Sequence, residues 1–230
     1  YGRDAQHARR VAAYERTMRE RSRLLRDGTG TDTWLSALEK TMAEYGVALA
    51  AARLETVVEL SERMLVPIGP FPGAKIELEG VVETWLSEIS FPEAEMAFRS
   101  ALSKSRFRDS KVGGAALGPH RTDLKVCHLG NGMPASQCST GEQKALLIAI
   151  FLADARMSSV RRNGAPLLLL DEVAAHLDDI YREALFSEIM SLGAQVWCTG
   201  TNLSVFHTIA PQAQIIQVND GTVRPEALPH

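Results

Sequence analysis

Two carboxylates follow a short apolar run in the C-terminal half of the chain, in the segment Leu167-Leu168-Leu169-Leu170-Asp171-Glu172. Such a run is typical of a central parallel strand covered on both faces. Ligands of open α/β sheets bind beyond the carboxyl ends of these strands. Asp171 could therefore hold Mg²⁺, directly or through water, and Glu172 could polarise the water that attacks a γ-phosphate. An acidic turn is the simpler alternative.

A second segment, Ser139-Thr140-Gly141-Glu142-Gln143-Lys144, carries groups that suit phosphate binding. A serine hydroxyl, a glycine and the free N–H groups of a helix N-terminus together form an anion site. Ser139 and Glu142 also match the capping box S-x-x-E, which by itself explains these residues as a helix start. The residues alone leave both interpretations open.

A third segment, Ala175-His176-Leu177-Asp178-Asp179, follows the acidic pair. Asp178 or Asp179 is predicted to cap the next helix, because a carboxylate accepts hydrogen bonds from the N–H groups of the first turn. The apolar residues of that helix recur on one face. They are Leu177, Tyr181, Leu185, Ile189 and Leu192.

The elements that must position these segments follow from the spacing of apolar residues. Helices are predicted over residues 4–26, from Asp32 or Thr33 to about 65, over 91–109, from 139 to about 159 and over 178–192. Strands are predicted over residues 75–80, 121–129, 167–170, 194–199 and 213–218. The first two helices form a predicted hairpin. The later alternation of strands and helices predicts a largely parallel α/β layer, with a boundary near residue 110.

Composition narrows the class of protein. Of the 230 residues, 45% are apolar and 23% charged, as in soluble globular proteins. No apolar run is long enough for a transmembrane helix. The three cysteines have no C-x-x-C spacing, which argues for a reducing, cytosolic compartment and against a disulfide scaffold or a structural zinc site. The chain does not begin with Met, which indicates part of a longer polypeptide.

The net charge of −3 conceals blocks of opposite sign. Residues 1–27 carry 8 Arg against 4 acids and residues 99–125 carry 7 bases against 2 acids. Between them, residues 28–98 carry 4 bases against 12 acids. A mildly negative total therefore does not exclude a polyanionic partner. Solvated helix faces are the simpler interpretation.

Together, the three segments resemble the second half of an ABC-type ATPase head. Ser139–Gln143 resembles the signature loop, Leu167–Glu172 resembles Walker B with its catalytic glutamate, and Leu177-Asp178 resembles the D-loop. Within that class the chain resembles the RecF family of the SMC-like branch. The stretch Gly118-Pro119-His120-Arg121-Thr122-Asp123 resembles its G-P-H-R-x-D, and Thr199-Gly200-Thr201 resembles the segment that closes its site. Two departures are Cys138, where Leu is usual, and Glu142, where Gln is usual.

The resemblance implies an α/β fold: a partial ABC-type ATPase head, P-loop NTPase-like with a parallel sheet and flanking helices, over residues 111–230. A helical arm precedes it over residues 1–110. No G-x-x-x-x-G-K-[ST] occurs, and Gly69–Lys75 has the wrong spacing and two prolines that remove N–H groups. Because the family carries its Walker A lobe before the arm, the chain is expected to lack that lobe.

The resemblance also implies a function: a cytoplasmic protein of DNA replication, recombination and repair that binds ATP and Mg²⁺ between two heads arranged head-to-tail. It implies binding at gapped or junction DNA, RecA loading with RecO and RecR, replication restart and the SOS response. Glu172 would be catalytic, Asp171 would hold Mg²⁺, and Leu177 and Asp178 would form the D-loop. The partner subunit would contribute the signature residues Ser139, Thr140, Gly141, Glu142 and Gln143.

The DNA-contact candidates are the two basic blocks, residues 1–27 and 99–125, and within the Arg-rich first helix they are Arg9, Arg10, Arg16 and Arg19. The complete protein is expected to be a weak DNA-dependent ATPase, and this chain alone to be inactive for want of Walker A. A non-catalytic interaction module, with a degenerate head, is the alternative from another class. Another SMC-like ATPase of chromosome maintenance is a further alternative, although the two-helix arm is short and no heptad repeat is sustained.

Overall fold

A computed structural model describes residues 6–162, 166–174 and 177–226. It consists of two compact units. The first, here called the arm unit, comprises Tyr1–Leu65 and Ala74–Cys138, and the second, here called the head unit, comprises Val66–Gly73 and Ser139–His230. None of the described helices has the length and apolar character needed to cross a membrane.

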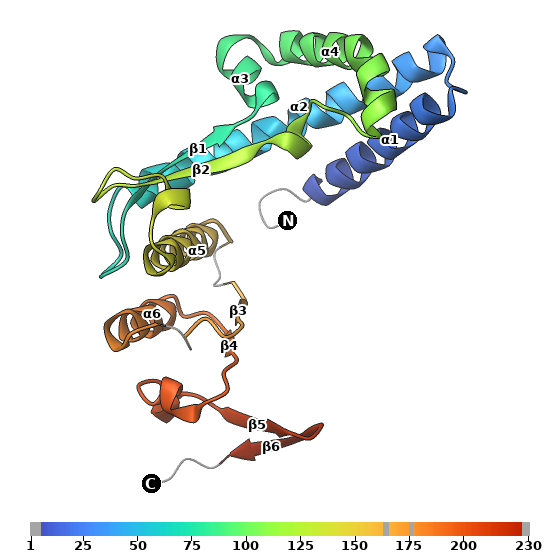
Figure 1. Cartoon of the computed structure of the whole chain (residues 1–230). Coiled ribbons are helices and arrows are strands. Elements are labelled where there is room, and N and C mark those ends of the chain that lie inside the picture. Colours follow the sequence, from blue (N-terminus) through green and yellow to red (C-terminus); the bar gives the residue numbers. More distant parts are fainter. Residues whose placement is uncertain (1–5, 163–165, 175–176, 227–230) are drawn as a thin grey trace. The chain divides into compact units, whose positions relative to one another are not determined.

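Three long helices make up most of the arm unit (Figure 1): α1 (His7–Asp27), α2 (Asp32–Met64) and α4 (Phe91–Val112). Helix α1 packs on α2 as the predicted hairpin, and α4 packs on both. The short helix α3 (Val81–Glu88) was not predicted, because eight residues give too few apolar repeats to show a period. The N-cap of α2 is Thr31, whose Oγ1 accepts a hydrogen bond from the Trp34 N–H, rather than Asp32 or Thr33.

A two-stranded antiparallel sheet completes the arm unit. Strand β1 (Ala74–Glu79) pairs with β2 (Asp123–His128), with Ala74 opposite His128. The polar–apolar alternation predicted for residues 75–80 is confirmed, since Ile76 is buried and its neighbours in sequence are exposed. This pairing ties residues 123–128 to the arm unit. The contacts therefore divide the chain after Cys138, whereas the division at residue 110 into arm and head stays a prediction.

The apolar core of the arm unit lies where the three long helices and α3 meet. Phe98 and Leu102 of α4 pack there with Met42 and Val47 of α2. Gly46 permits this close packing, because a Cβ atom at that position would lie 2.7 Å from the Phe98 ring. The helices therefore approach at a small residue, as close packing requires.

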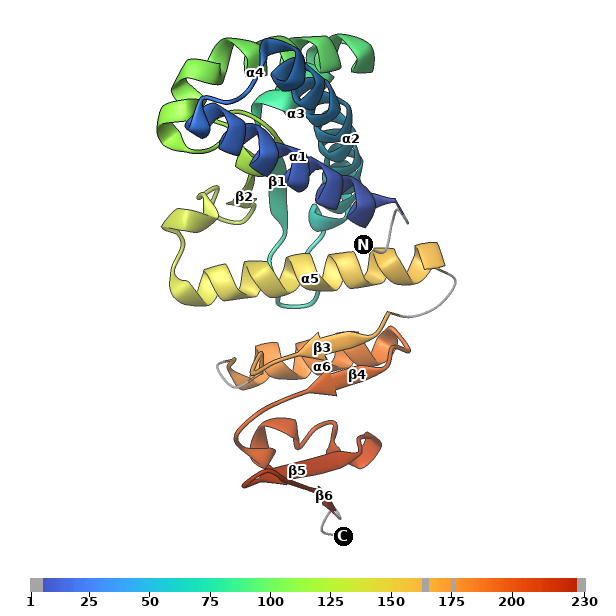
Figure 2. The same cartoon turned by 90° about the vertical axis from the view of Figure 1, so that its right-hand side faces the viewer.

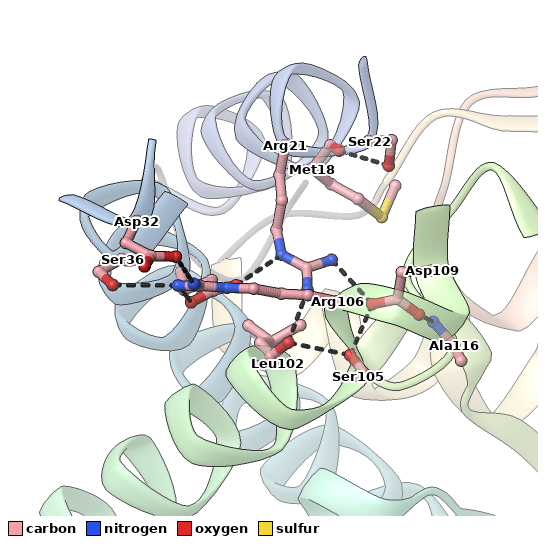
Figure 3. Close-up of polar contacts among 11 residues, drawn as sticks. Met18, Arg21, Ser22, Asp32, Ser36, Leu102, Ser105, Arg106, Asp109 and Ala116 are labelled. Carbon is pink, nitrogen blue, oxygen red and sulfur yellow. Dashed lines mark hydrogen bonds and ion pairs between the residues drawn. The ribbon is translucent and has the colours of Figure 1, made fainter. Parts of the chain in front are cut away.

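A buried arginine connects α1 to the other two helices (Figure 3). Arg21 is 0% exposed, and its guanidinium donates to Glu39 Oε1 at 3.0 Å and to Asp109 Oδ2 at 2.8 Å. It also donates to the Leu102 carbonyl at 2.6 Å. Both carboxylates are themselves buried. Burial of charges is tolerated here because each charge has opposite-charge and hydrogen-bond partners.

A second arginine shares this network, here called the Arg21 network. Arg106 donates from Nε to Glu39 Oε1 at 2.8 Å and from Nη2 to Glu39 Oε2 at 2.7 Å. It also pairs with the exposed Asp32 at 2.9 Å. The Asp109 carboxylate accepts further bonds from the Ser105 hydroxyl at 2.6 Å and from the Ala116 N–H at 3.1 Å. The network thus spans α1, α2, α4 and the segment after α4.

The head unit contains helix α5 (Thr140–Arg162) and helix α6 (Asp179–Ser191). Its strands are β3 (Leu168–Leu170), β4 (Val196–Cys198), β5 (Ile215–Asn219) and β6 (Thr222–Glu226). The short 3₁₀ segments of the described chain are Pro119–Arg121, Ala135–Gln137, Leu203–Phe206 and Ala210–Gln212. The predicted parallel pairing holds for β3 and β4. Strand β5 instead forms an antiparallel hairpin with β6 (Figure 2), which was not predicted because Pro225 weakens the strand signal.

Strand β3 is covered on one face only by the described residues, contrary to the prediction of cover on both. Leu168 and Leu170 are buried, whereas Leu169 is 69% exposed. Its neighbour across the parallel pair is Trp197, which is also exposed. The period of two along a strand places these two apolar side chains on the same open face of the sheet.

The Arg21 network gives a prediction for stability. Replacing Arg21 by Ala leaves the buried carboxylates of Glu39 and Asp109 with fewer partners, so the free energy of unfolding should fall by about 3–5 kcal/mol. Arg23→Ala is the matched control, because Arg23 is exposed on the same helix. Urea unfolding followed by circular dichroism measures both. A loss for Arg21→Ala no larger than that for the control would contradict the assigned role of the network.

Candidate functional site

The two carboxylates after β3 lie beside the end of the neighbouring strand. The Thr199 hydroxyl, directly after β4, donates to Asp171 Oδ1, and it accepts a hydrogen bond from the Glu172 N–H at 3.1 Å. The Thr199 N–H donates to the Leu170 carbonyl at 3.0 Å. Parallel pairing of Leu170 with Cys198 brings both carboxyl ends to one sheet edge. The predicted position of the acidic pair, at the carboxyl end of a parallel strand, is confirmed.

Glu172 has an unusual backbone conformation. Its φ is 53°, in the left-handed region that residues other than glycine rarely adopt. The hydrogen bond to Thr199 holds the backbone in this turn, which leaves Asp171 exposed and Glu172 partly exposed. The sequence indicated residues 199–201 only by resemblance and gave no role to the Thr199 side chain. A polar residue directly after the neighbouring strand was the available signal.

The start of α5 has the predicted capping box. The Glu142 N–H donates to Ser139 Oγ at 3.3 Å, and the Ser139 N–H donates to Glu142 Oε2 at 2.8 Å. The Ser139 hydroxyl donates to the same carboxylate oxygen at 2.8 Å. Thr140, Gly141 and Gln143 are exposed, and a Cβ atom at Gly141 would meet nothing within 4 Å. The prediction of a capping box is thus confirmed. Phosphate binding at this turn stays a prediction, and the exposure of the first turn is compatible with it.

The start of α6 is capped by Asp178, as predicted. Its Oδ1 accepts a hydrogen bond from the Tyr181 N–H at 2.9 Å. Arg182 donates to the Leu177 carbonyl at 2.7 Å and to Asp179 Oδ1 at 2.7 Å. Leu177 is thereby fixed with its side chain buried, while Asp178 is exposed. The two residues before Leu177 lie outside the described residues.

Two aromatic contacts join elements of the head unit that are distant in sequence. The Phe71 ring contacts the Tyr181 ring with centroids 5.2 Å apart, and Phe186 contacts Phe206 at 6.0 Å. Phe71 belongs to the Val66–Gly73 segment, which explains why this segment groups with the head unit. These contacts hold α6 and the segment after β4 on a common core.

The residues predicted to bind phosphate and Mg²⁺ lie in two hydrogen-bonded clusters of the head unit. The hydrogen bonds at the start of α5 connect Ser139 to Glu142, and those at the ends of β3 and β4 connect Asp171 and Glu172 to Thr199. Among the residues that the structure describes, no group of three or more His, Cys, Asp or Glu could by itself hold a metal ion. Mg²⁺ commonly takes one or two carboxylates and completes its shell with substrate phosphates and water. A single exposed carboxylate at Asp171 fits that mode.

The four arginines predicted to bind DNA differ in their exposure to solvent. Arg9, Arg16 and Arg19 are exposed on α1, whereas Arg10 is partly buried and donates to Gln6 at 3.5 Å. Arg21 is fully buried in the Arg21 network and cannot contact a partner, and the partly exposed Arg106 is bonded to Glu39 in the same network. The count of basic residues therefore overestimated the positive charge at the surface, because a composition does not show which side chains are buried.

The G-P-H-R stretch is fixed on the arm unit by hydrogen bonds. The Tyr14 hydroxyl lies 2.8 Å from His120 Nδ1, and His120 Nε2 lies 2.9 Å from the Ala115 carbonyl. A carbonyl only accepts, so Nε2 carries the proton and the Tyr14 hydroxyl donates to Nδ1. Gly118 has a φ of 138°, and a Cβ atom there would lie 2.3 Å from the Tyr14 hydroxyl. Arg53 donates to the Pro119 carbonyl.

Burial sets the protonation of this pair. It raises the pKa of Tyr14 above its ordinary value and lowers the pKa of His120 below its ordinary value of 6.5. The nearby guanidinium groups of Arg121 and Arg53 lower the pKa of His120 further, whereas the Ala115 carbonyl and Asp109 oppose the shift. His120 is therefore neutral near pH 7, and in the neutral ring Nε2 donates to the Ala115 carbonyl while Nδ1 accepts from the Tyr14 hydroxyl.

Comparison with known proteins identifies what the chain resembles, although no family model matches it. A curated protein of Mesorhizobium japonicum is 46% identical over 224 residues, which are 96% of this chain and 59% of that protein. A protein of Brucella abortus is 46% identical over 95% of this chain and 57% of its own length. Both are named DNA replication and repair protein RecF. The relatives are RecF proteins. The predicted resemblance to the RecF family is confirmed, and the chain spans about three fifths of the RecF proteins it matches.

Solved structures agree on the fold. A structure described as the recombination mediator protein RecF-ATPrS in the RecFOR pathway superposes with a TM-score of 0.79, at 22% identity, over 97% of this chain and 60% of that chain. One described as RecF-ATP in the same pathway gives a TM-score of 0.77, at 22% identity, over 97% of this chain and 59% of that chain. This similarity confirms the predicted fold class, α/β with parallel strands and flanking helices together with a helical part, as the fold of these RecF structures.

The Thr199 bridge gives a prediction for local order. Replacing Thr199 by Val removes the hydroxyl that accepts from the Glu172 N–H and donates to Asp171. The Glu172 N–H should then exchange with solvent faster, by roughly fivefold for the loss of about 1 kcal/mol of hydrogen bonding. Nuclear magnetic resonance measures the exchange rate. Thr201→Val, in the same exposed loop, is the control and should leave the rate unchanged.

The neutral His120 gives a prediction for pH dependence. Because the pKa of His120 is lowered in the folded chain, the unfolded chain binds more protons as the pH falls through about 6.5. The stability that His120 contributes is thus present above that pH and is lost below it. The difference in unfolding free energy between the wild type and His120→Gln should shrink from about pH 8 to about pH 5. An equal difference at both values would contradict the assignment.

Proposed function

We propose that the chain is the arm and part of the head of a RecF-like DNA replication and repair protein that uses ATP to hold two head domains together. The observation that carries the proposal is the acidic pair held at the carboxyl edge of parallel strands, in a chain 46% identical to RecF proteins over 96% of its length. If Asp171 and Glu172 formed only a surface turn, the turn would not need the Thr199 hydroxyl to bond to both of these consecutive residues.

In the proposed site the Glu172 carboxylate accepts the proton of the water that attacks the γ-phosphate. Its side chain is partly exposed, so water reaches it, and the fixed turn limits the range of positions that the carboxylate can take. The Asp171 carboxylate, exposed and accepting from Thr199, would hold Mg²⁺ directly or through water. When bound, Mg²⁺ would neutralise charge on the phosphates.

The signature loop would act on the nucleotide of the opposite subunit in a symmetric head-to-tail dimer. Ser139, Thr140, Gly141 and Gln143 are exposed at the first turn of α5, and the N-terminus of a helix favours the binding of an anion such as phosphate. Glu142 completes the capping box and donates its backbone N–H to Ser139. Leu177 and Asp178 would form the D-loop at the same interface, with Asp178 exposed at the start of α6.

The remaining parts of the proposal concern the complete protein. We infer that it is a cytoplasmic, weak DNA-dependent ATPase that binds DNA at gaps and junctions and supports RecA loading with RecO and RecR. Replication restart and the SOS response would depend on it. The likeness to structures described as belonging to the RecFOR pathway supports these partners. The 230 residues contain no Walker A motif, so the chain alone is proposed to hydrolyse almost no ATP.

The proposed role of Glu172 can be tested in the complete protein. Glu172→Gln keeps the size of the side chain but removes the proton acceptor, so the turnover of ATP should fall by about 100-fold or more. Dimers that form with ATP should persist or become longer-lived, because hydrolysis is what releases them. Phosphate release and sedimentation velocity measure the two properties. Glu183→Gln is the control, an exposed glutamate on α6.

Two results would contradict the proposal. Turnover of Glu172→Gln equal to that of the control would remove Glu172 from the reaction. A wild-type protein that neither hydrolyses ATP nor dimerises with it would favour the non-catalytic interaction module.

A further inference from the structure

Helix α1 presents a row of arginines to solvent. Successive residues of an α-helix are rotated by about 100°, so residues three, four and seven apart share a face. Five exposed arginines fall within an arc of about 100° by this spacing. They are Arg9, Arg16, Arg19, Arg23 and Arg26, here called the arginine face.

The opposite side of α1 is buried, which fixes the direction of the arginine face. Tyr14, Thr17, Arg21 and Leu24 lie on that side and pack into the arm unit. Arg10 lies on the same side and is partly buried. The Arg21 network holds α1 in this rotation, because Arg21 reaches Glu39 and Asp109 only from one face of the helix. The arginine face is therefore held toward solvent by the fold of the arm unit.

Few acidic groups neutralise the arginine face. Arg19 forms an ion pair with Glu15 at 3.8 Å, with both side chains more than half exposed. Such exposed pairs hold each other weakly. Glu20 and Asp27 border the face. Arg9, Arg16, Arg23 and Arg26 form no ion pair with any residue that the structure describes.

The dimensions of this face suit a row of phosphates. From Arg9 to Arg26 the helix rises by about 25 Å, at about 1.5 Å per residue. Each strand of a DNA duplex carries about one phosphate per 3.4 Å along its axis, so the face is as long as about seven base pairs. Proteins that prefer single strands stack bases on exposed aromatic side chains. The described part of α1 has only Tyr14 as an aromatic residue, and it is buried.

We propose that the arginine face binds the phosphate backbone of double-stranded DNA without reading its sequence. This inference rests on the proposed DNA-binding function and names the surface and the form of DNA. Compared with the candidates predicted from the sequence, the proposed contact residues include Arg23 and Arg26 and leave out Arg10. Arginine suits this role because it stays charged and its planar fork matches phosphate oxygens.

The test compares two triple variants of the chain, each lacking three exposed positive charges. Arg16→Ala/Arg19→Ala/Arg23→Ala removes the centre of the arginine face, and alanine favours helix, so α1 should keep its fold. Arg99→Ala/Lys104→Ala/Arg108→Ala is the matched control on α4, where all three residues are exposed. Circular dichroism confirms that both variants fold. Fluorescence anisotropy with a labelled duplex of about 30 base pairs gives Kd over a range of salt concentrations.

The expected result is a weakening of duplex binding by roughly 10-fold or more at low salt for the α1 variant, with the salt slope reduced by about 2 to 3. The α4 control should bind like the wild type, and a single strand of equal length should bind the wild type more weakly. If the wild type binds duplex and the α1 variant binds equally well, the arginine face is not the contact, although DNA binding stands. If the wild-type chain binds no duplex at low salt, both this inference and the proposed DNA binding by these residues are wrong.

Discussion

The arm unit depends on one buried cation. Arg21 has no exposed surface, and it brings α1 against the carboxylates of Glu39 on α2 and Asp109 on α4. Buried ion pairs contribute little net stability compared with apolar packing, but removal of one partner is costly. The network therefore acts mainly as a constraint on rotation and register: α1 satisfies it in one orientation. That orientation turns the arginine face to solvent and places Tyr14 against His120.

The head unit depends on a different constraint, the parallel pairing of β3 and β4. It brings Thr199 beside the end of β3, where one hydroxyl serves both Asp171 and Glu172. The positive φ of Glu172 is tolerated because this hydrogen bond holds the turn. The open face with Leu169 shows that the described residues cover only one side of these strands. The acidic site is thus ordered by local hydrogen bonds rather than by burial.

Much of this architecture could be predicted because it depends on local patterns. The long helices, the alternation in β1 and the caps at Ser139 and Asp178 all follow from residues a few positions apart. The features that were missed depend on residues distant in sequence. Composition counts Arg21 as part of a basic surface, whereas partners 18 and 88 residues away place it in the core. The Thr199 bridge spans 27 residues and requires strand register, which no local pattern provides.

In the proposed function, Glu172 of one subunit and the first turn of α5 of the other contact the same nucleotide. The most direct measurement is a structure of the complete protein with a slowly hydrolysed ATP analogue. We expect a symmetric dimer in which the γ-phosphate lies between Glu172 of one subunit and the Ser139–Gln143 turn of the other. A nucleotide contacted by both segments of the same subunit, or bound by a monomer with that turn left in solvent, would contradict this expectation.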